Sequence, residues 1–190
     1  MEKHKARLVS GGHRGAEAEF GRAAALWNIP ETTFTFEGHV MEHSGEVETL
    51  SEADLARGDV SMDFVFANLR REFHRGKGIR RVIQSMFHVV TRGDELFAVG
   101  WILPDDHVKG GTGWGVELAK FFHRKVSVFD QDKRRWYTWI GGSWQESDPV
   151  IPNGPFAATG TRNLTDDGRT AIHELFERSF GPAAASPRRS

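Results

Sequence analysis

Three short glycine-bearing stretches have the residue types and the spacing to bind a phosphate group. They are Ser10–Gly15, Gly110–Gly113 and Gly160–Arg162, and each follows an apolar, strand-like run and leads into a helix-like stretch. Glycine permits a positive φ and lets a ligand approach the peptide N–H groups closely. A helix that begins there directs N–H donors and a partial positive charge at the same point. Three such junctions in one chain predict a phosphate-bearing ligand at the carboxyl ends of the strands.

Charged side chains in or beside these stretches extend the predicted site. Arg14 and Arg162 carry guanidinium groups, which suit phosphate oxygens, although either can equally be an exposed surface charge. Glu117 lies one helical turn after the second stretch, where a carboxylate could hydrogen-bond a ribose or stabilise an oxocarbenium-like centre during glycosidic cleavage. Glu117 is therefore the candidate catalytic residue. The predicted ligand-binding residues are Ser10, Gly11, Gly12, Arg14, Gly15, Glu17, Gly110, Gly111, Thr112, Gly113, Gly160, Thr161 and Arg162.

Three further groups of residues have a functional and a structural interpretation. Arg80 and Arg81 begin a helix after a glycine-rich linker, a position more typical of a surface pair than of a ligand contact. The aromatic side chains of residues 136–144 could stack a base, but they also suit a hairpin that covers a sheet edge or a dimer contact. The nine histidines do not cluster in the sequence, so we predict no metal site and no cofactor.

The composition limits the classes of function. Hydrophobic residues make up 38% of the chain, charged residues 27%, and the formal net charge is −1, which disfavours a broad nucleic-acid-binding face. The absence of cysteine excludes disulfides, thiolate metal sites and a cysteine nucleophile, and it suits a reducing compartment. We find no signal peptide and no apolar run long enough to cross a membrane. We expect a cytoplasmic protein without membrane partners. Whether it forms a homo-oligomer stays an open question.

Strand-like and helix-like segments alternate along the chain, which predicts an α/β fold with a mostly parallel sheet. The predicted strands are 6–9, 32–36, 95–102, 126–129 and 156–159, with a hairpin over 135–145. The predicted helices are 15–27, 59–73, 79–91, 115–123 and 165–180, with a short helix capped near Ser51 and a loop over 37–51. We expect one domain over residues 1–181 and a disordered tail over 182–190.

The first two glycine stretches resemble motifs of the SLOG superfamily. These Rossmann-like proteins include DNA-processing protein A, the "lonely guy" phosphoribohydrolases and molybdenum-carrier proteins. Leu8–Glu17 is similar to the pattern SGG-x-x-G-(A/V)-(D/E), and the resemblance implies that Glu17 touches a ribose hydroxyl. Gly110–Glu117 is similar to PGG-x-G-T-x-x-E, but Lys109 replaces the proline and Trp114 the threonine. The altered signature favours binding over catalysis.

The third stretch resembles the first strand and G-S-R loop of the same fold, yet it comes last in this sequence. Phe156–Arg162 therefore suggests a circular permutation that moves the first strand and helix to the carboxyl terminus. The resemblance implies a sheet of order 3-2-1-4-5 with helices on both faces, in which 156–159 is strand 1, 7–10 is strand 2 and 96–101 is strand 4. The three glycine stretches then meet at one crevice, where the strand order reverses.

Two functions follow from the motifs and the resemblance. The first is binding of a nucleotide or nucleotide-derived phosphate ligand, as a sensor or sequestering protein. The alternative is an N-glycosidase-type phosphoribohydrolase that releases the base from a nucleoside monophosphate. Whether the protein is an enzyme stays open at this point, as does the identity of the base.

Overall fold

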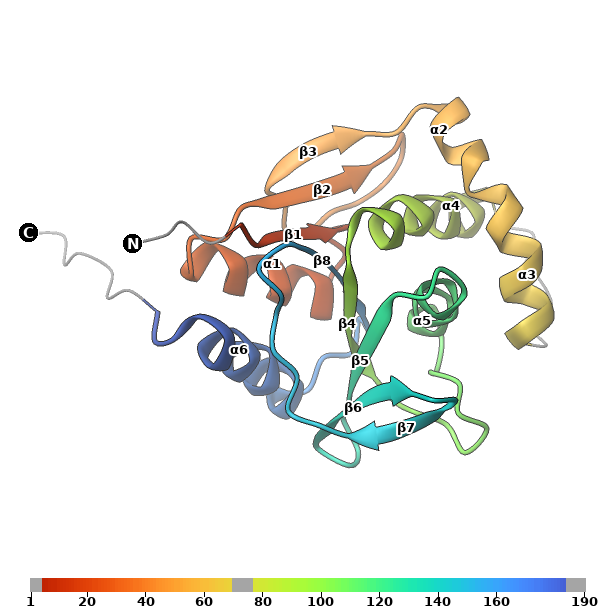
Figure 1. Cartoon of the computed structure of the whole chain (residues 1–190). Helices are drawn as coiled ribbons and strands as arrows, with labels where there is room; N and C mark the ends of the chain where they lie inside the picture. The colour runs from red at the N-terminus through yellow and green to blue at the C-terminus, as the bar shows by residue number, and fades with distance from the viewer. Residues whose placement is uncertain (1–4, 70–76, 184–190) are drawn as a thin grey trace, which may run out of the picture.

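The computed structural model describes residues 5–69 and 77–183, in which strands and helices alternate (Figure 1). The strands are β1 (Arg7–Ser10), β2 (Glu31–Thr35), β3 (Glu46–Thr49), β4 (Glu95–Gly100), β5 (Lys125–Asp130), β6 (Arg135–Ile140), β7 (Ser143–Glu146) and β8 (Pro155–Gly160). The helices are α1 (Ala16–Leu26), α2 (Glu52–Arg57), α3 (Asp59–Leu69), α4 (Lys77–Arg92), α5 (Thr112–Phe121) and α6 (Asp166–Phe180). Most of the predicted tail and the end of the helix predicted over 59–73 lie outside the described residues.

These strands form one sheet in the order β3-β2-β1-β8-β4-β5-β6-β7. Six neighbouring strands are parallel to one another, namely β3, β2, β1, β8, β4 and β5. Strands β6 and β7 extend the sheet beyond β5 as an antiparallel hairpin. The predicted α/β class and the predicted order of the five central strands are confirmed, because β2-β1-β8-β4-β5 corresponds to 3-2-1-4-5. The sheet is wider than predicted, since β3 extends one edge and the hairpin extends the other.

Strand β8, from the end of the sequence, lies in the middle of this sheet. Leu8 pairs with Phe156 on one side of β8, and Leu96 pairs with Ala157 on the other side. The side chains of Phe156, Ala157 and Ala158 are buried, as a strand covered on both faces requires. The central position is the one that the order of the motifs predicts. The circular permutation that would explain it stays a prediction.

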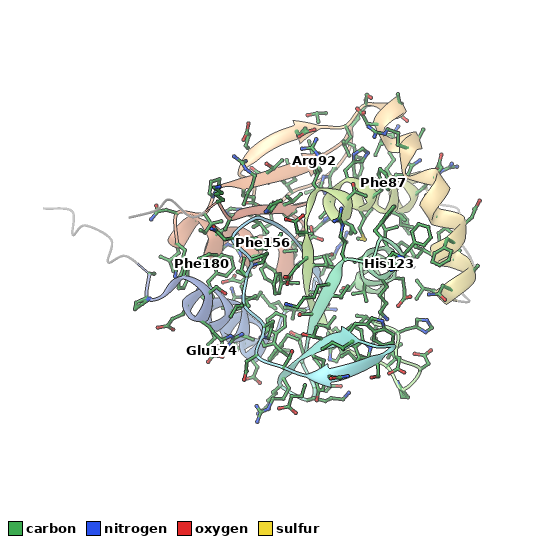
Figure 2. All side chains as sticks on the ribbon, viewed as in Figure 1. Phe87, Arg92, His123, Phe156, Glu174 and Phe180 are labelled. Carbon is green, nitrogen blue, oxygen red and sulfur yellow. The ribbon has the colours of Figure 1, made fainter. Side chains whose placement is uncertain are left out.

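Helices cover both faces of the sheet, as predicted (Figure 1). Helices α1 and α6 pack against each other on one face, over a core that includes Phe20, Phe156 and Phe176. Helices α4 and α5 cover the other face over Leu96 and Val128, and α3 packs against α5. Figure 2 shows Phe156 inside the molecule and Glu174 of α6 on its outer side. Among the described residues, no helix has both the length and the hydropathy to cross a bilayer.

Side-chain caps fix where two of the helices begin. The Oγ of Ser51 accepts a hydrogen bond from the Asp54 N–H at 3.2 Å, and the Asp54 carboxylate accepts one from the Ser51 N–H at 3.0 Å. This capping box begins α2. The Oγ1 of Thr165 accepts a hydrogen bond from the Gly168 N–H at 3.1 Å and begins α6.

Two elements differ from the sequence predictions. The loop predicted over 37–51 is wrong for Glu46–Thr49, which forms β3. Its largely exposed E-V-E-T pattern lacks a buried apolar face, so the pairing with β2 leaves little trace in the sequence. Helix α5 begins at Thr112 rather than at residue 115. The second glycine stretch therefore includes the first two residues of that helix, and this changes the direction in which later residues of α5 point.

Candidate functional site

A cavity of about 490 Å³ lies at the carboxyl ends of β4 and β8, beside the beginnings of α1 and α5. We call it the crevice. Parallel strands of this fold class place their ligands at this end of the sheet. The residues that line the crevice are His13, Glu17, Ile79, Val82, Met86, Trp101, Lys109, Gly110, Gly111, Thr112, Trp114, Thr159, Gly160, Thr161, Arg162 and Asn163.

The structure brings together some of the predicted ligand-binding residues and separates others. The crevice contains Glu17, Gly110, Gly111, Thr112, Gly160, Thr161 and Arg162. Its lining does not include Ser10, Gly11, Gly12, Arg14, Gly15 or Gly113. The second and third glycine stretches therefore face the cavity, whereas the first contributes His13, and Glu17 follows it on α1.

Backbone packing explains the glycines of the first stretch. Gly12 has a φ of +68°, and a Cβ there would lie 2.1 Å from the His43 carbonyl oxygen. Gly15 has a φ of +94°, and a Cβ there would lie 2.4 Å from the Thr161 carbonyl oxygen. That carbonyl accepts a hydrogen bond from the Ala16 N–H at 3.0 Å. The first N–H of α1 is thus used by the protein itself and is not free to bind a phosphate.

Ser10 and Arg14 also have roles away from the crevice. The Ser10 hydroxyl is buried, donates to Glu31 Oε1 at 2.7 Å and accepts from the Gly12 N–H at 3.1 Å. Arg14 is exposed and does not line the cavity. Ser10 therefore holds the turn together, and neither residue lines the crevice.

The second stretch has the open backbone that an anion site needs. A Cβ on Gly111 would meet no atom within 4 Å, and Gly111 caps α5 without any side-chain hydrogen bond. The N–H groups of Gly113 and Trp114 donate to the carbonyls of Gly110 and Gly111. Within the described residues this leaves the N–H groups of Gly111 and Thr112 as the donors that the start of α5 can offer to a ligand.

Two cations and two indole rings line the same cavity. Neither Lys109 nor Arg162 has an ion-pair partner within residues 5–69 and 77–183. The Lys109 Nζ lies 5.4 Å from the centroid of the Trp101 ring, and the Trp101 Nε1–H donates to Asp132 at 3.0 Å. Trp114 is the second indole. Lys109 and Trp114, the two positions at which the sequence departs from the pattern PGG-x-G-T-x-x-E, both line the crevice.

A buried carboxylate forms part of the crevice wall. Glu17 is 5% exposed; its Oε1 accepts from the Thr159 hydroxyl at 2.9 Å, and its Oε2 accepts from the His13 N–H at 3.2 Å. The His13 Nδ1 lies 2.9 Å from the same Oε2. Burial alone would raise the pKa of Glu17, but the hydrogen bonds and the charge of His13 outweigh it and lower that pKa below its ordinary value. Glu17 is therefore ionised at neutral pH.

A second histidine continues this network. The Nε2 atoms of His13 and His39 lie 2.9 Å apart, and the His39 Nδ1 lies 3.1 Å from the Thr35 hydroxyl. Burial and the nearby charge of His13 lower the pKa of His39 to about 4, so His39 is neutral at pH 7. Burial also opposes the charged form of His13, but Glu17 outweighs it and raises the pKa of His13. No sequence motif indicates this pair, because His13 and His39 come from loops that are separated by α1 and β2.

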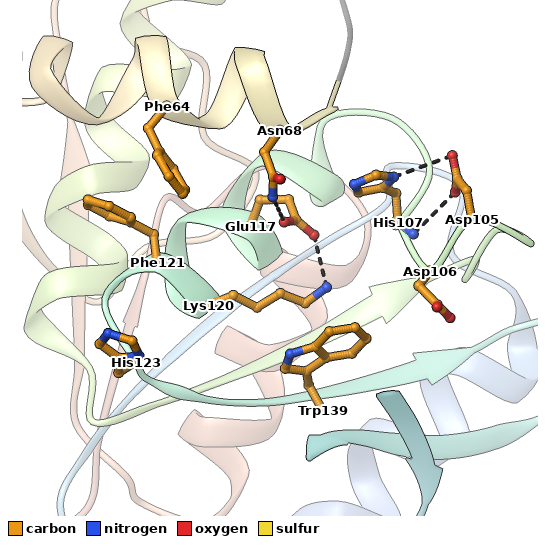
Figure 3. A pocket seen from close by; sticks show the side chains of 10 residues that line it. All are labelled: Phe64, Asn68, Asp105, Asp106, His107, Glu117, Lys120, Phe121, His123 and Trp139. Carbon is orange, nitrogen blue, oxygen red and sulfur yellow. Dashed lines mark hydrogen bonds and ion pairs between the residues drawn. The ribbon is translucent and has the colours of Figure 1, made fainter. Parts of the chain in front are cut away.

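Glu117 lies in a different cavity of about 580 Å³ (Figure 3). Its carboxylate accepts from the Asn68 amide at 2.5 Å and from the Lys120 ammonium at 2.9 Å, and its side chain is 3% exposed. This corrects the expectation that Glu117 faces the ligand loop. Because α5 begins at Thr112, Glu117 lies roughly 140° around the helix from that residue.

The hairpin aromatics and the arginine pair have structural partners. Trp136 is buried in the core, and Trp139 and Trp144 lie 3.7 Å and 4.8 Å from the Lys120 Nζ, measured to their ring centroids. Arg80 pairs with Asp59 and Arg81 with Glu52. None of these side chains lines the crevice. Among the described residues, no group of three or more histidine or acidic side chains is arranged to hold a metal ion.

Comparison with known proteins supports the fold. No protein-family model and no curated protein matches the sequence. The crystal structure of a "putative molybdenum carrier protein" from Syntrophus aciditrophicus SB is similar, with a TM-score of 0.54 and 16% identity over 90% of this chain and 92% of that chain. At this identity the likeness shows the fold alone. The shared fold agrees with the fold that the SLOG resemblance implies. It does not identify the ligand, which must be inferred from the residues that line the crevice.

Proposed function

We propose that the protein binds a nucleotide or a nucleotide-derived phosphate ligand in the crevice, as a sensor or sequestering protein. The observation that carries this proposal is the joint presence in one cavity of an open helix start, indole rings and two cations that have no ion-pair partner among residues 5–69 and 77–183. A volume of about 490 Å³ falls within the range of small-molecule sites.

The cationic groups and the helix start favour a phosphate. Lys109 and Arg162 approach the cavity from two different loops, and the first turn of α5 adds N–H donors and the positive end of the helix dipole. An arginine fork and backbone N–H groups both match the tetrahedral array of phosphate oxygens. Among the described residues of the lining, Glu17 is the single acidic side chain, and the His13 N–H and the Thr159 hydroxyl donate to its carboxylate.

The apolar part of the lining favours a base attached to that phosphate. Trp101 and Trp114 contribute indole rings to the lining, and α4 adds Ile79, Val82 and Met86. Stacking of a base on an aromatic side chain contributes about 1–3 kcal/mol. A bare phosphate would leave this surface exposed to water, whereas a nucleotide would cover it.

The second candidate function, hydrolysis of a nucleoside monophosphate, is favoured by one observation. Glu17 places a buried, ionised carboxylate in the crevice, where it could stabilise a developing oxocarbenium ion. Any such activity would depend on Glu17 rather than on Glu117, because Glu117 lines the other cavity.

Calorimetric titration with adenosine, guanosine, cytidine and uridine 5′-monophosphates tests the proposal. We expect Gly111→Leu to weaken binding at least about tenfold, or about 1.4 kcal/mol, because the new side chain occupies the open space before α5. Folding should be unaffected, since no atom lies within 4 Å of the new Cβ and the φ is ordinary. Gly78→Leu is the matched control, because Gly78 is equally open and does not line the crevice.

Each outcome of this titration has a distinct meaning. Unchanged affinity in Gly111→Leu would count against the crevice as the site, and absence of binding to every nucleotide would count against the function. Chromatography of the same mixtures detects released base. Release by the wild-type protein that is lost in Glu17→Gln would favour the hydrolase over the sensor.

A further inference from the structure

We propose that His13 takes up a proton when an anionic ligand binds in the crevice, so that Glu17, His13 and His39 form a proton-uptake network of the binding site. The inference rests on the proposed function, because the coupling needs an anion beside Arg162. It assigns to this site a dependence on pH and a role for two histidines that no sequence motif indicates.

The network can gain one proton without losing a hydrogen bond. In the first state His13 is neutral: its Nδ1–H donates to Glu17, its Nε2 accepts from His39, and the His39 Nδ1 accepts from the Thr35 hydroxyl. In the second state His13 carries a proton on both nitrogens and donates to Glu17 and to His39. The His39 Nδ1–H then donates to Thr35. Only tautomers and one hydroxyl rotor change, so the same geometry serves both states.

The extra proton changes the charge that the crevice presents to a ligand. In the first state Glu17 contributes an uncompensated negative charge to the wall, which repels an anion. In the second state the Glu17–His13 pair is neutral, and Lys109 and Arg162 remain as the net charge of the lining. An anion therefore binds more tightly to the protonated network, and by linkage its binding must draw a proton onto the network.

The charged groups around His13 determine the sign of this coupling. Glu17 of α1 raises the pKa of His13, and Arg162, which follows β8, lowers it. Lys109, before α5, is a further cation of the lining, and His39 is neutral. Helix α4 contributes uncharged side chains to the cavity, while its Arg81 is paired with Glu52 and the Glu37 carbonyl. A phosphate that pairs with Arg162 cancels the charge that disfavours protonated His13, so the pKa of His13 rises on binding.

Calorimetry in buffers of different ionisation enthalpy measures the number of protons taken up per bound ligand. We would titrate adenosine 5′-monophosphate into the wild-type protein and into His13→Asn at pH 7.5. The ligand's own phosphate titrates near pH 6 in both experiments, so the difference between the two proteins reports on His13. His123→Asn is the control, because His123 lines the other cavity and its φ of +53° suits asparagine.

We expect the wild-type protein and His123→Asn to take up a larger fraction of a proton than His13→Asn, and their affinity to fall more steeply between pH 6.5 and pH 8.5. Equal uptake in the wild type and His13→Asn would overturn the coupling while leaving the proposed function intact. Absence of binding by the wild type would overturn both.

A second measurement covers the case in which His13→Asn fails to fold or to bind. The NMR titration of the His13 ring in the wild-type protein gives its pKa with and without the nucleotide. A higher pKa in the complex is the expected result, and an unchanged or lower pKa would overturn the proposal.

Discussion

His39 is kept neutral by its surroundings, and the cost of protonating it should be visible in the stability of the fold. Its ring stacks on Phe36 with centroids 4.7 Å apart, and it contacts the His13 and Thr35 side chains. Its pKa is lowered to about 4 by burial and by the charge of His13, whereas an unfolded chain binds that proton near 6.5.

Acid should destabilise the folded protein through His39. Between pH 6.5 and pH 4 the unfolded state holds more protons at His39 than the folded state, so the free energy of unfolding falls as the pH drops. His39 is half-buried, so we expect this loss to be about 1–2 kcal/mol larger in the wild type than in His39→Gln. Urea denaturation at pH 7 and pH 4 measures it. Identical pH dependence of the two proteins would show that His39 is not the group responsible.

Individual residues show how far the sequence predicted the site. Glu17, Gly111 and Arg162 are predicted from motifs and do line the crevice. The partners of Glu17 could not be predicted, because His13 and His39 meet only when β1 and β2 lie side by side. Glu117 has the spacing of a ligand contact, but its direction depends on where α5 begins, and no side-chain cap marks that residue.

At the scale of elements, β8 and α6 act as one unit that completes both cores. β8 hydrogen-bonds to β1 and to β4, and α6 covers the α1 face with Ile172, Leu175 and Phe176 buried. The Glu19 carboxylate of α1 joins this unit to the rest of the molecule through Arg169 and His173.

Removing this unit should therefore prevent folding. A chain that ends at Gly154 leaves β1 and β4 without their shared neighbour and exposes the apolar faces of α1 and the sheet. We expect it to lack a cooperative thermal transition by circular dichroism. A chain that ends at Ala183 keeps every described residue of α6 and is the control, with an unchanged Tm. A cooperative transition in the shorter chain would contradict the central role of β8.

The regular elements were predictable where burial leaves a pattern in the sequence. Buried parallel strands such as β4, β5 and β8 read as continuous apolar runs, and α6 begins at a threonine cap. Strand β3 could not be predicted, because an edge strand with exposed side chains needs no apolar face. The fold was thus more predictable than the site, which depends on loops.

At the scale of the whole molecule, the start of β1 and the end of α6 lie at the same end of the sheet (Figure 1). The Lys5 N–H donates to Asn153, just before β8, at 2.7 Å, and the Trp27 indole at the end of α1 donates to the Gly181 carbonyl at 2.7 Å. The chain could therefore run from α6 directly into β1, which is the order that the circular permutation implies.

A reordered chain tests this relationship. It would begin at Gly154, continue from Gly181 into Lys5 through a flexible linker of about ten residues, and end at Asn153. We expect the same fold and a Tm within about 5 °C of the wild type, because β8, α6 and β1 keep their contacts and only loop connections change. Matching heteronuclear NMR spectra would establish the common fold. An aggregated or unfolded product would show that the present order is required.

The position of β8 also dictates when this protein can fold during its synthesis. Translation proceeds from the amino terminus, so β1, β2, β4 and β5 leave the ribosome before the strand that joins them. Until then β1 and β4 each present an unpaired edge with apolar neighbours such as Leu8 and Leu96. Such edges are templates for pairing with other chains. The complete sheet therefore cannot form until β8 has been synthesised, and those two edges stay open to mispairing until then.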